Sequence, residues 1–388
     1  MAAPTPTSER DERLSRLREQ MARAQLDALL VGCKGHWWTG RGYARYLIDF
    51  HLWGHDGLIL VPLEGEPALS VSSPTIAALI AERGWISDAR GDMLVLPALL
   101  AALRERGLER SRIGMVGGRW IIPVGMAREF EAELPNVELV DADALFDRVR
   151  MVKSAVEIRQ NREVWELAKA AMERFGALLE PGVSQRALAA EACAVALAGG
   201  ARDLLVLISE EAGASRPPAD VPIRCDDILR YHMEISGESG HWCELTITWA
   251  FRPLEDAEQR LIASEIRALD AVADAARPGA RLADLAAVFE QTVREDGFEL
   301  GEPTRHFDFH GQGMDTIEFP WFAAEQPWGG SQDTELVAGT VISYHPRRNV
   351  QPQVAWSPGV SDNLLVRERS PAERLSGEWS HEWREVST

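Results

Sequence analysis

Histidine and carboxylate side chains recur in three separate segments of the chain. Residues 226–251 read DDILRYHMEISGESGHWCELTITWAF, residues 305–320 read RHFDFHGQGMDTIEFP, and residues 339–346 read GTVISYHP. Together they offer a candidate ligand set of five side chains: His232, Glu234, Glu244, His310 and His345. Imidazole nitrogens and carboxylate oxygens suit a transition metal such as Zn, Fe, Mn or Ni. The same groups also suit acid–base catalysis without a metal.

The first segment is typical of two strands joined by a hairpin turn. Residues 227–235 are predicted to be extended, and side chains alternate along a strand. Arg230, His232 and Glu234 therefore share one face. The SGESG sequence favours a hairpin, so the returning strand brings Glu244 towards this face. An ordinary sheet with a polar, solvent-facing side fits the same pattern, and the spacing does not separate the two interpretations.

The second segment places His306 and His310 four residues apart, beside a Gly-x-Gly sequence. Glycine has no Cβ, so the backbone at HGQGM can approach a ligand closely. His310 is well placed as a ligand, although a histidine satisfied by hydrogen bonds near a turn is the commoner case. In the third segment, His345 ends an apolar strand just before a proline. Each histidine alone is a weak signal.

The composition excludes several classes of partner. The chain has 388 residues, 46% of them hydrophobic, which is enough for two globular domains. A net charge of −19 argues against nucleic acid and anionic membranes, because both need clustered positive charge. We therefore expect a small-molecule partner. Widely spaced cysteines, the lack of an apolar signal core and the lack of a long apolar run predict a cytoplasmic protein without disulfides.

The pattern of elements changes near residues 148–153. Residues 1–10 are polar and are predicted to be a frayed tail. A helix over 12–25, a buried strand after it and further alternating helices and strands predict a small α/β domain with a parallel or mixed sheet. Beyond the boundary, long helices accompany strands that pair by hairpins. The second domain is therefore predicted to be α+β.

From about residue 12 to 367, the chain resembles the creatinase, aminopeptidase P and prolidase superfamily. RLSRLREQMARAQLDALLV resembles the start of the creatinase N-terminal domain, and VRMVKSAVEIRQNREVWELAKAAM resembles the start of the catalytic domain. The hairpin segment, HFDFHGQGMDTIEFP, LVAGTVISYHP and GVSDNLLV then follow in the family's order. The resemblance implies an α+β fold: a creatinase-like α/β domain at 12–150 and a pita-bread catalytic domain at 151–370. It also implies a homodimer.

The metal ligands of this superfamily are Asp, Asp, His, Glu and Glu, and the resemblance carries over only His310 unchanged. The first aspartate corresponds to His232 or to Glu234, depending on the register. The second corresponds to Glu244, which is one methylene longer. The site therefore departs from the family pattern at its first two positions.

The later positions depart as well. His345 and Ser361 stand where the resemblance implies two glutamates, with Asp362 beside Ser361. His306 corresponds to the first histidine of an aminopeptidase P-like pair, but a later histidine of that segment is missing. The loop near Arg216 also lacks a histidine that peptidases of this family carry. Dinuclear chemistry and Xaa-Pro peptidase activity are therefore not expected.

The resemblance instead implies a creatinase-like hydrolase or lyase for a small non-peptide metabolite. We expect hydrolysis or elimination at a C–N bond by histidine and glutamate groups, with no metal or one metal ion. A lyase or another reaction at a reprogrammed mononuclear metal site is one alternative. A catalytically inactive small-molecule-binding homologue is another.

Imidazole suits proton transfer near neutral pH, because its unperturbed pKa is about 6.5. We therefore expect His310 or His232 to move the proton. Glu244 or Glu318 is expected to orient the imidazole or to act as the base. His306 is a further candidate, because the resemblance places it in the site wall.

Arginine and tryptophan side chains are the expected substrate-binding groups. In family dimers the N-terminal domain reaches over the partner's active site, so the resemblance implies that Arg41 or Arg45 pairs with a substrate carboxylate. Five tryptophans predict an aromatic pocket for a flat or cationic substrate: Trp242, Trp249, Trp321, Trp328 and Trp356. Ordinary packing is the alternative for any one of them.

Overall fold

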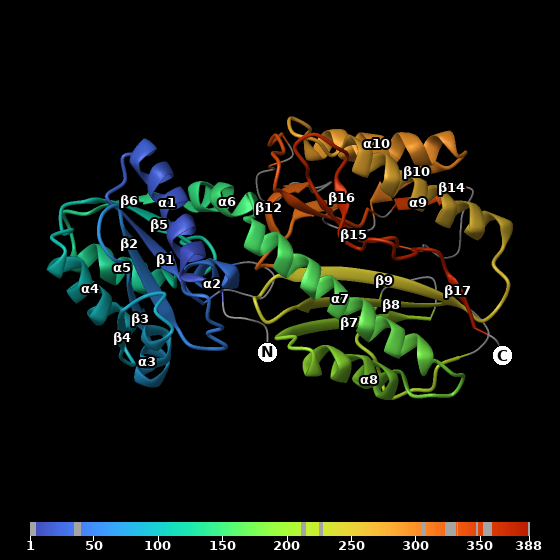
Figure 1. The fold of residues 1–388 in the computed structure, drawn as a ribbon, viewed down its shortest axis with the longest axis horizontal. Coiled ribbons are helices and arrows are strands. Elements are labelled where there is room, and N and C mark those ends of the chain that lie inside the picture. Colours follow the sequence, from blue (N-terminus) through green and yellow to red (C-terminus); the bar gives the residue numbers. More distant parts are fainter. Residues whose placement is uncertain are drawn as a thin grey trace. The chain divides into compact units, whose positions relative to one another are not determined.

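The computed structural model describes residues 5–34, 40–210, 215–224, 228–303, 308–322, 331, 333–346, 348–351 and 359–386. The chain forms two compact units (Figure 1). The N-terminal unit extends to Arg150 and includes Met314–Thr316. The C-terminal unit begins at Met151 and contains the rest of the chain.

The N-terminal unit is a mixed sheet with helices. The strands are β1 (Ala28–Gly32), β2 (Gly57–Pro62), β3 (Ala68–Val71), β4 (Asp88–Gly91), β5 (Arg112–Val116) and β6 (Glu138–Asp141), in the order β4-β3-β2-β1-β5-β6. The helices are α1 (Thr7–Arg23), α2 (Arg41–Ile48), α3 (Pro74–Glu82), α4 (Val95–Glu105), α5 (Val124–Glu133) and α6 (Asp143–Met151). The central strand β1 pairs antiparallel with β2 and parallel with β5. This mixed sheet confirms the predicted α/β domain.

The predicted frayed tail is wrong from Thr7 onwards, where α1 begins. Glu9 and Arg13 lie one turn apart on this helix and form a buried ion pair with 2.9 Å between Oε1 and Nε. Arg13 also donates to the backbone oxygen of Tyr46 at 3.0 Å. The polar start of the chain therefore contains an ion pair that is buried like a core residue.

The described residues of the C-terminal unit form two larger sheets and four helices. The helices are α7 (Ala155–Ala177), α8 (Gln185–Ala198), α9 (Asp256–Ala275) and α10 (Leu282–Glu295). One sheet has the order β17-β9-β8-β7, formed by β7 (Asp203–Ser209), β8 (Ile228–Ser236), β9 (Trp242–Ala250) and β17 (Arg384–Glu385). The other has the order β12-β11-β13-β15-β16, formed by β11 (Phe309–Gly311), β12 (Glu318–Phe322), β13 (Val341–Tyr344), β15 (Asp362–Leu365) and β16 (Glu373–Arg374). A short ribbon pairs β10 (Glu299–Pro303) with β14 (Arg348–Gln351).

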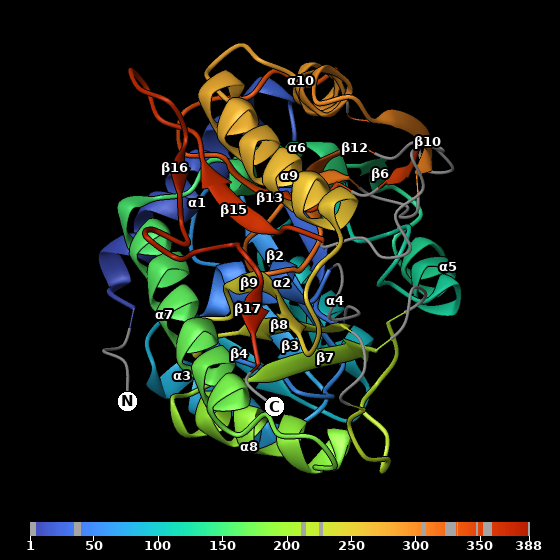
Figure 2. The same cartoon turned by 90° about the vertical axis from the view of Figure 1, so that its right-hand side faces the viewer.

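Each sheet of this unit has its own pair of covering helices. Figure 2 shows α7 with α8 on one side of the strands and α9 with α10 on the other. The core beneath α9 and α10 includes Phe309 and Tyr344 from the five-stranded sheet. Helices and hairpin-paired strands are thus combined in one unit, as predicted for an α+β domain.

Helix α7 covers one face of the β8–β9 hairpin and leaves the other face for chemistry. Ser154 caps the helix by accepting a hydrogen bond from Glu157 N, so the helix starts where a capping residue precedes it. Phe175 of α7 stacks on Tyr231 with ring centroids 3.9 Å apart. Phe175 also contacts Trp249 at 5.1 Å. Trp249 therefore belongs to the helix-facing core, and its predicted place in a substrate pocket is wrong.

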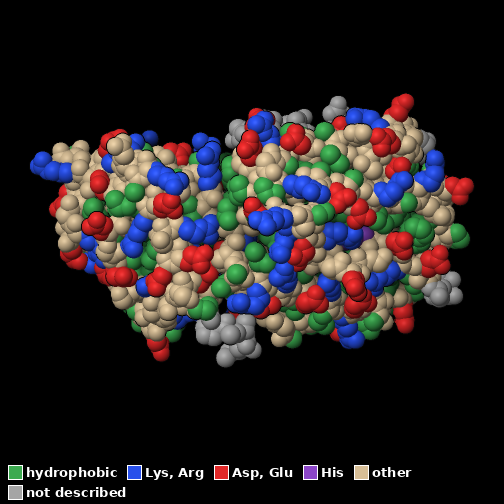
Figure 3. Space-filling model, turned by 45° about the horizontal axis from the view of Figure 1, so that its top comes forward, with side chains coloured by type: hydrophobic (Ala, Val, Ile, Leu, Met, Phe, Trp, Pro, Cys, Tyr) green, Lys and Arg blue, Asp and Glu red, His purple; other side chains and the backbone are tan. Residues whose placement is uncertain are grey.

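The structure also bears on the predictions about membrane spans, cysteines and surface charge. Among the described residues, no helix is both long and apolar enough to cross a membrane. Cys33, Cys193 and Cys243 are free thiols, and Cys225 lies outside the described residues. Figure 3 shows acidic and basic side chains interspersed over the face that it draws. The cytoplasmic location and the homodimer stay predictions.

Candidate metal and acid–base site

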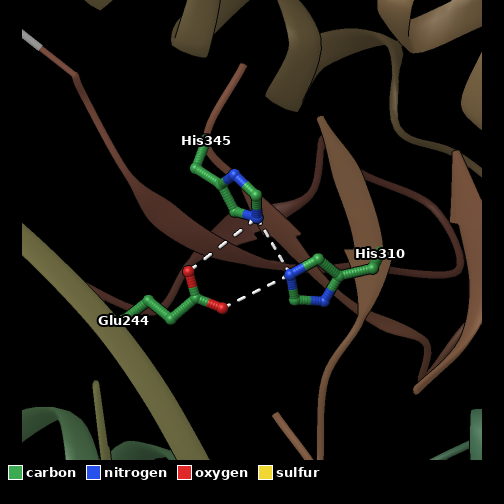
Figure 4. Close-up of side chains that lie close together, drawn as sticks. All are labelled: Glu244, His310 and His345. Atoms are coloured by element: carbon green, nitrogen blue, oxygen red, sulfur yellow. Dashed lines mark hydrogen bonds and ion pairs between the residues drawn. The ribbon is translucent and has the colours of Figure 1, made fainter. Parts of the chain in front are cut away.

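Three buried side chains from three strand segments meet in the C-terminal unit (Figure 4). Glu244 lies on β9, His310 lies on β11, and His345 directly follows β13. His310 Nε2 is 3.3 Å from Glu244 Oε1 and 2.9 Å from His345 Nε2. His345 Nε2 is 3.8 Å from Glu244 Oε2. One carboxylate and two imidazole nitrogens therefore point into one small volume.

A second group of candidate ligand atoms shares Glu244 with the first. Glu234 on β8 lies directly opposite Glu244 on β9, and His232 lies on the same face as Glu234. The ligand atoms of His232, Glu234 and Glu244 all lie within 4.8 Å of one another, as do those of Glu244, His310 and His345. The five residues proposed from the sequence are thus neighbours in the fold.

His232 is hydrogen-bonded at both ring nitrogens. Its Nδ1 lies 2.8 Å from Thr246 Oγ1, and its Nε2 lies 2.9 Å from Glu234 Oε1. Ser361 Oγ donates to Thr246 Oγ1 at 3.1 Å. Sequence reasoning gave Thr246 no role, although the hairpin register could have found it, because pairing Glu234 with Glu244 pairs His232 with Thr246.

Asp362 does not replace the carboxylate that is missing at Ser361. Asp362 Oδ2 lies 3.1 Å from His381 Nε2 and accepts a hydrogen bond from Arg374 Nε at 3.2 Å. Burial favours the neutral form, but hydrogen bonds from His381 and Ser376 and the charges of His381 and Arg374 hold the pKa of Asp362 below its ordinary value. Ser361 instead contacts Thr246 beside the candidate ligands, whereas Asp362 contacts His381 and Arg374.

Gln312 supports Glu244 and was missed by sequence reasoning. Its Nε2 donates to Glu244 Oε1 at 2.9 Å, and the whole side chain is buried. Burial raises the pKa of Glu244, but the neighbouring imidazoles of His345 and His310 outweigh it, so this pKa lies well below its ordinary value. The shift favours the ionised carboxylate, which is the form that binds a metal. The available signal was the position of Gln312 between the two glycines of the HGQG sequence.

The first group has the donor types and spacing for one divalent ion. Two histidines with one glutamate occur in catalytic zinc sites, and two histidines with one carboxylate form the facial triad of non-haem iron. Ligand bonds of about 2.1 Å place neighbouring donor atoms roughly 3.0–3.4 Å apart. The separations here are 2.9, 3.3 and 3.8 Å. The first two separations are close to this range and the third is longer, so a small shift of His345 or Glu244 would bring all three donors around a single ion.

Two further features of the site agree with the binding of a single ion. His310 Nδ1 lies 2.9 Å from the carbonyl oxygen of Gly311, which only accepts hydrogen bonds, so Nδ1 carries the proton and Nε2 keeps a lone pair. Ser343 lies directly opposite His310 on β13. Its hydroxyl is buried and has no hydrogen-bond partner among the described residues. A polar atom is thus available beside the ligand group.

Glu318, a predicted base or orienting group, lies in a buried ion pair. Lys153 Nζ donates to Glu318 Oε2 at 2.7 Å, and the two side chains are 1% and 5% exposed. A Cβ on Gly313 would lie 2.5 Å from the same Oε2, and a Cβ on Gly311 would lie 2.3 Å from the backbone oxygen of Phe319. The two glycines therefore make room for β12 and its ion pair.

The predicted tryptophans differ in their positions. Trp242 is buried at the start of β9, and its backbone N–H donates to Gly313 O at 2.8 Å. Trp321 is half-buried on β12, directly opposite His310. His306 lies outside the described residues, as do two of the five tryptophans, Trp328 and Trp356. Of the predicted aromatic residues, Trp321 is thus paired in register with a candidate ligand.

The two predicted arginines belong to the N-terminal unit. Arg41 is half-buried at the start of α2. Arg45 is buried on the same helix, with Nη1 3.3 Å from His51 Nδ1. Arg45 therefore has a contact within its own unit, and a substrate-binding role for either arginine stays a prediction.

Replacing Gln312 by leucine is expected to weaken metal binding by about 10- to 100-fold, because residues that hold a ligand commonly contribute that much. Competition with a chromogenic chelator at fixed pH measures the affinity. Gln291→Leu on α10 is the matched control, since its exposed amide donates only to Glu295 among the contacts seen, at 2.8 Å. Unchanged affinity in Gln312→Leu would contradict the supporting role.

Two family models match the chain. The model for metallopeptidase family M24 matches residues 159–368. The model for the Creatinase/Prolidase N-terminal domain matches residues 13–152. The match to M24 covers more than half of the chain and contains every residue of the candidate ligand set.

Individual relatives are distant. An uncharacterised hydrolase/peptidase of Sinorhizobium fredii is 24% identical over 315 residues, which are 76% of this chain and 78% of that protein. The dipeptidase PepE of Mycobacterium ulcerans has a TM-score of 0.79 at 20% identity, covering 99% of this chain and 100% of that one. An X-Pro aminopeptidase of Thermotoga maritima has a TM-score of 0.79 at 16% identity, covering 96% and 99%.

At such identities the solved structures show the fold alone, which is the predicted creatinase-like domain followed by a pita-bread domain. The resemblance read from the sequence motifs is confirmed by the two family matches. The chain therefore belongs to metallopeptidase family M24 and carries a Creatinase/Prolidase N-terminal domain.

Proposed function

We propose that this chain is a hydrolase that uses one divalent transition metal to cleave a C–N bond of a small non-peptide molecule. Glu244, His310 and His345 would hold the ion. The observation that carries the proposal is the convergence of their buried donor atoms, which lie 2.9 to 3.8 Å apart. Zinc and iron(II) are the ions that best match two imidazoles and one carboxylate.

The charge of the site favours one ion over two. The two overlapping ligand groups contain only two carboxylates, Glu234 and Glu244, along with three histidines. Two divalent ions would bring four positive charges against these two negative charges in a buried place, which is costly. One ion is balanced by the two carboxylates. Membership in a metallopeptidase family supports hydrolysis as the reaction class.

The ion, when bound, supplies Lewis acidity, which polarises the bond under attack and makes water more acidic. The protein supplies proton transfer through Glu234 and His232. The side chain of Glu234 is 12% exposed, against 3% for His232, so the carboxylate is the more accessible end of the pair. Glu234 accepts the proton of the attacking water, and His232 orients Glu234 through the 2.9 Å contact between Nε2 and Oε1.

The substrate class follows from the altered ligand set. Four of the five ligand positions differ from the family pattern that the resemblance implies, so a site built for peptide cleavage by two ions is not retained. Relatives are nevertheless named for peptide cleavage, among them a dipeptidase and an X-Pro aminopeptidase. Peptides therefore form the competing substrate class in the test.

Metal analysis of protein purified without chelator tests the proposal. We expect about one equivalent of zinc or iron per chain, and activity that is lost on chelation and restored by that metal alone. The metal-loaded protein is then assayed on Xaa-Pro dipeptides and on small amides, ureas and amidines. Hydrolysis of the small compounds, with little cleavage of the dipeptides, is the expected result.

Two variants separate the roles. Glu244→Gln is expected to lose the metal, whereas Glu234→Gln is expected to keep it and lose turnover by about 10²- to 10⁴-fold, the usual contribution of a general base. Two equivalents of bound metal would contradict the one-ion site. Efficient cleavage of Xaa-Pro dipeptides would contradict the substrate class, and full turnover by metal-free protein would contradict the whole proposal.

A further inference from the structure

Four side chains form a continuous hydrogen-bonded series beside the ligand group. Ser361 Oγ contacts Thr246 Oγ1 at 3.1 Å, and Thr246 Oγ1 contacts His232 Nδ1 at 2.8 Å. His232 Nε2 then contacts Glu234 Oε1 at 2.9 Å. Ser361, Thr246 and His232 are each no more than 4% exposed, so water does not compete for these hydrogen bonds. The series ends at the more exposed Glu234.

The direction of these hydrogen bonds follows from the chemistry of their ends. Ser361 donates to Thr246, whose own proton then has His232 Nδ1 as its acceptor. A ring nitrogen that accepts is unprotonated, so the proton of a neutral His232 must lie on Nε2. An ionised Glu234 only accepts hydrogen bonds, which requires the same arrangement from the other end. Both ends therefore assign His232 the Nε2–H tautomer.

We infer that Thr246 and Ser361 are positioning residues that lock His232 in this tautomer, so that its proton points at Glu234. This inference rests on the acid–base role proposed above for His232 and Glu234. A fixed imidazole orients Glu234, the carboxylate that accepts the proton of the attacking water. Neither hydroxyl contacts the reacting atoms in this scheme, and both act through His232.

The tautomer also separates the two overlapping ligand groups. A histidine binds a metal through an unprotonated nitrogen. Nε2 of His232 is protonated and faces Glu234, whereas Nε2 of His310 keeps its lone pair because Nδ1 donates to Gly311 O. His310 can therefore bind an ion through Nε2, whereas Nε2 of His232 is occupied by its contact with Glu234.

Ser361 has the type of side chain that this arrangement needs. A carboxylate at the same position, as the family resemblance implies, would accept the proton of Thr246 instead of donating to it. His232 Nδ1 would then have to donate to Thr246, which moves the proton away from Nε2. A serine at this position is therefore compatible with an acid–base role for His232, whereas a carboxylate is not.

Nitrogen NMR of histidine-labelled, metal-free protein tests the tautomer directly. The chain has nine histidines, and His232→Gln assigns the resonance of interest. At neutral pH we expect a protonated Nε2 and an unprotonated, hydrogen-bonded Nδ1 for His232. In Thr246→Val the Nδ1 resonance should move to that of a nitrogen without a donor, and Thr246→Ser should restore it.

Turnover and metal content complete the test. Thr246→Val is expected to lower kcat by about 10- to 100-fold with KM and bound metal unchanged, the usual range for a residue that orients another. Thr248→Val, on the same face of β9 and opposite Arg230, is the control and should leave the His232 spectrum unchanged. A wild-type His232 protonated at Nδ1, as the other tautomer or as imidazolium, would overturn the inference. An Nδ1 resonance that does not move in Thr246→Val would overturn it as well.

The result is distinguishable from failure of the proposed function. If the protein binds one ion and turns over while His232 carries its proton on Nδ1, the positioning inference fails and the proposed function stands. If His232 has the Nε2–H tautomer and the protein neither binds a metal nor turns over, the proposed function fails and the tautomer assignment stands.

Discussion

His310→Ala is expected to lower kcat/KM on the order of 10³-fold and to leave bound metal well below one equivalent. The variant removes one of three protein ligands, and Lewis-acid stabilisation of a transition state amounts to several kcal/mol. It also removes the imidazole that lies 3.3 Å from Glu244, so the remaining carboxylate loses a partner. Steady-state kinetics and metal analysis on the same preparation measure both effects.

The control for this variant is His55→Ala in the N-terminal unit, a half-buried histidine outside the ligand groups. It is expected to retain wild-type metal content and turnover. If His310→Ala kept its metal while losing activity, His310 would be the proton-transfer group that the sequence also allowed, and the ligand assignment would fail. His345→Ala is expected to behave as His310→Ala does.

Lys153→Met is expected to lower the free energy of unfolding by about 3–5 kcal/mol, because it leaves a carboxylate buried without its partner. The ion pair between Lys153 and Glu318 has a 2.7 Å contact and side chains that are 1% and 5% exposed. Denaturant unfolding followed by tryptophan fluorescence measures the loss. The double variant Lys153→Met, Glu318→Leu should recover much of it, since no charge is then left buried.

An exposed pair provides the contrast. Lys169 Nζ lies 2.7 Å from Glu166 Oε1, but the two side chains are 18% and 73% exposed. Lys169→Met is therefore expected to cost roughly 0–1 kcal/mol, as solvent already screens that pair. Similar losses in Lys153→Met and Lys169→Met, or no recovery in the double variant, would show that burial of the Lys153 pair does not set its contribution.

The architecture and the proximity of the candidate ligand residues could be predicted because their signals are local or follow the chain in order. Alternation along β8 put His232 and Glu234 on one face, and the SGESG turn brought Glu244 to them. One of the long helices predicted beyond the domain boundary begins after Ser154 and is confirmed. Each of these inferences needed only the side-chain periodicity of one element or the position of one turn.

The remaining contacts depend on strands that are distant in sequence. Gln312 reaches Glu244 across 68 residues, and Lys153 reaches Glu318 across 165 residues. No periodicity links such positions, so a glutamate read as a catalytic base is found in an ion pair. The misplacement of Trp249 has a different cause, since counting along β9 from Glu244 already puts it on the opposite face.

Gly311 and Gly313 have a consequence for how this family diversifies. Their lack of a side chain accommodates the backbone of Phe319 and the carboxylate of Glu318, and neither contact involves the reacting groups. The pressure to keep these glycines is therefore steric and is the same whatever bond is cleaved. A change of the ligands around Glu244 therefore leaves the need for these two glycines unchanged. The two glycines thus belong to the architecture of this unit, and the residues around Glu244 set its chemistry.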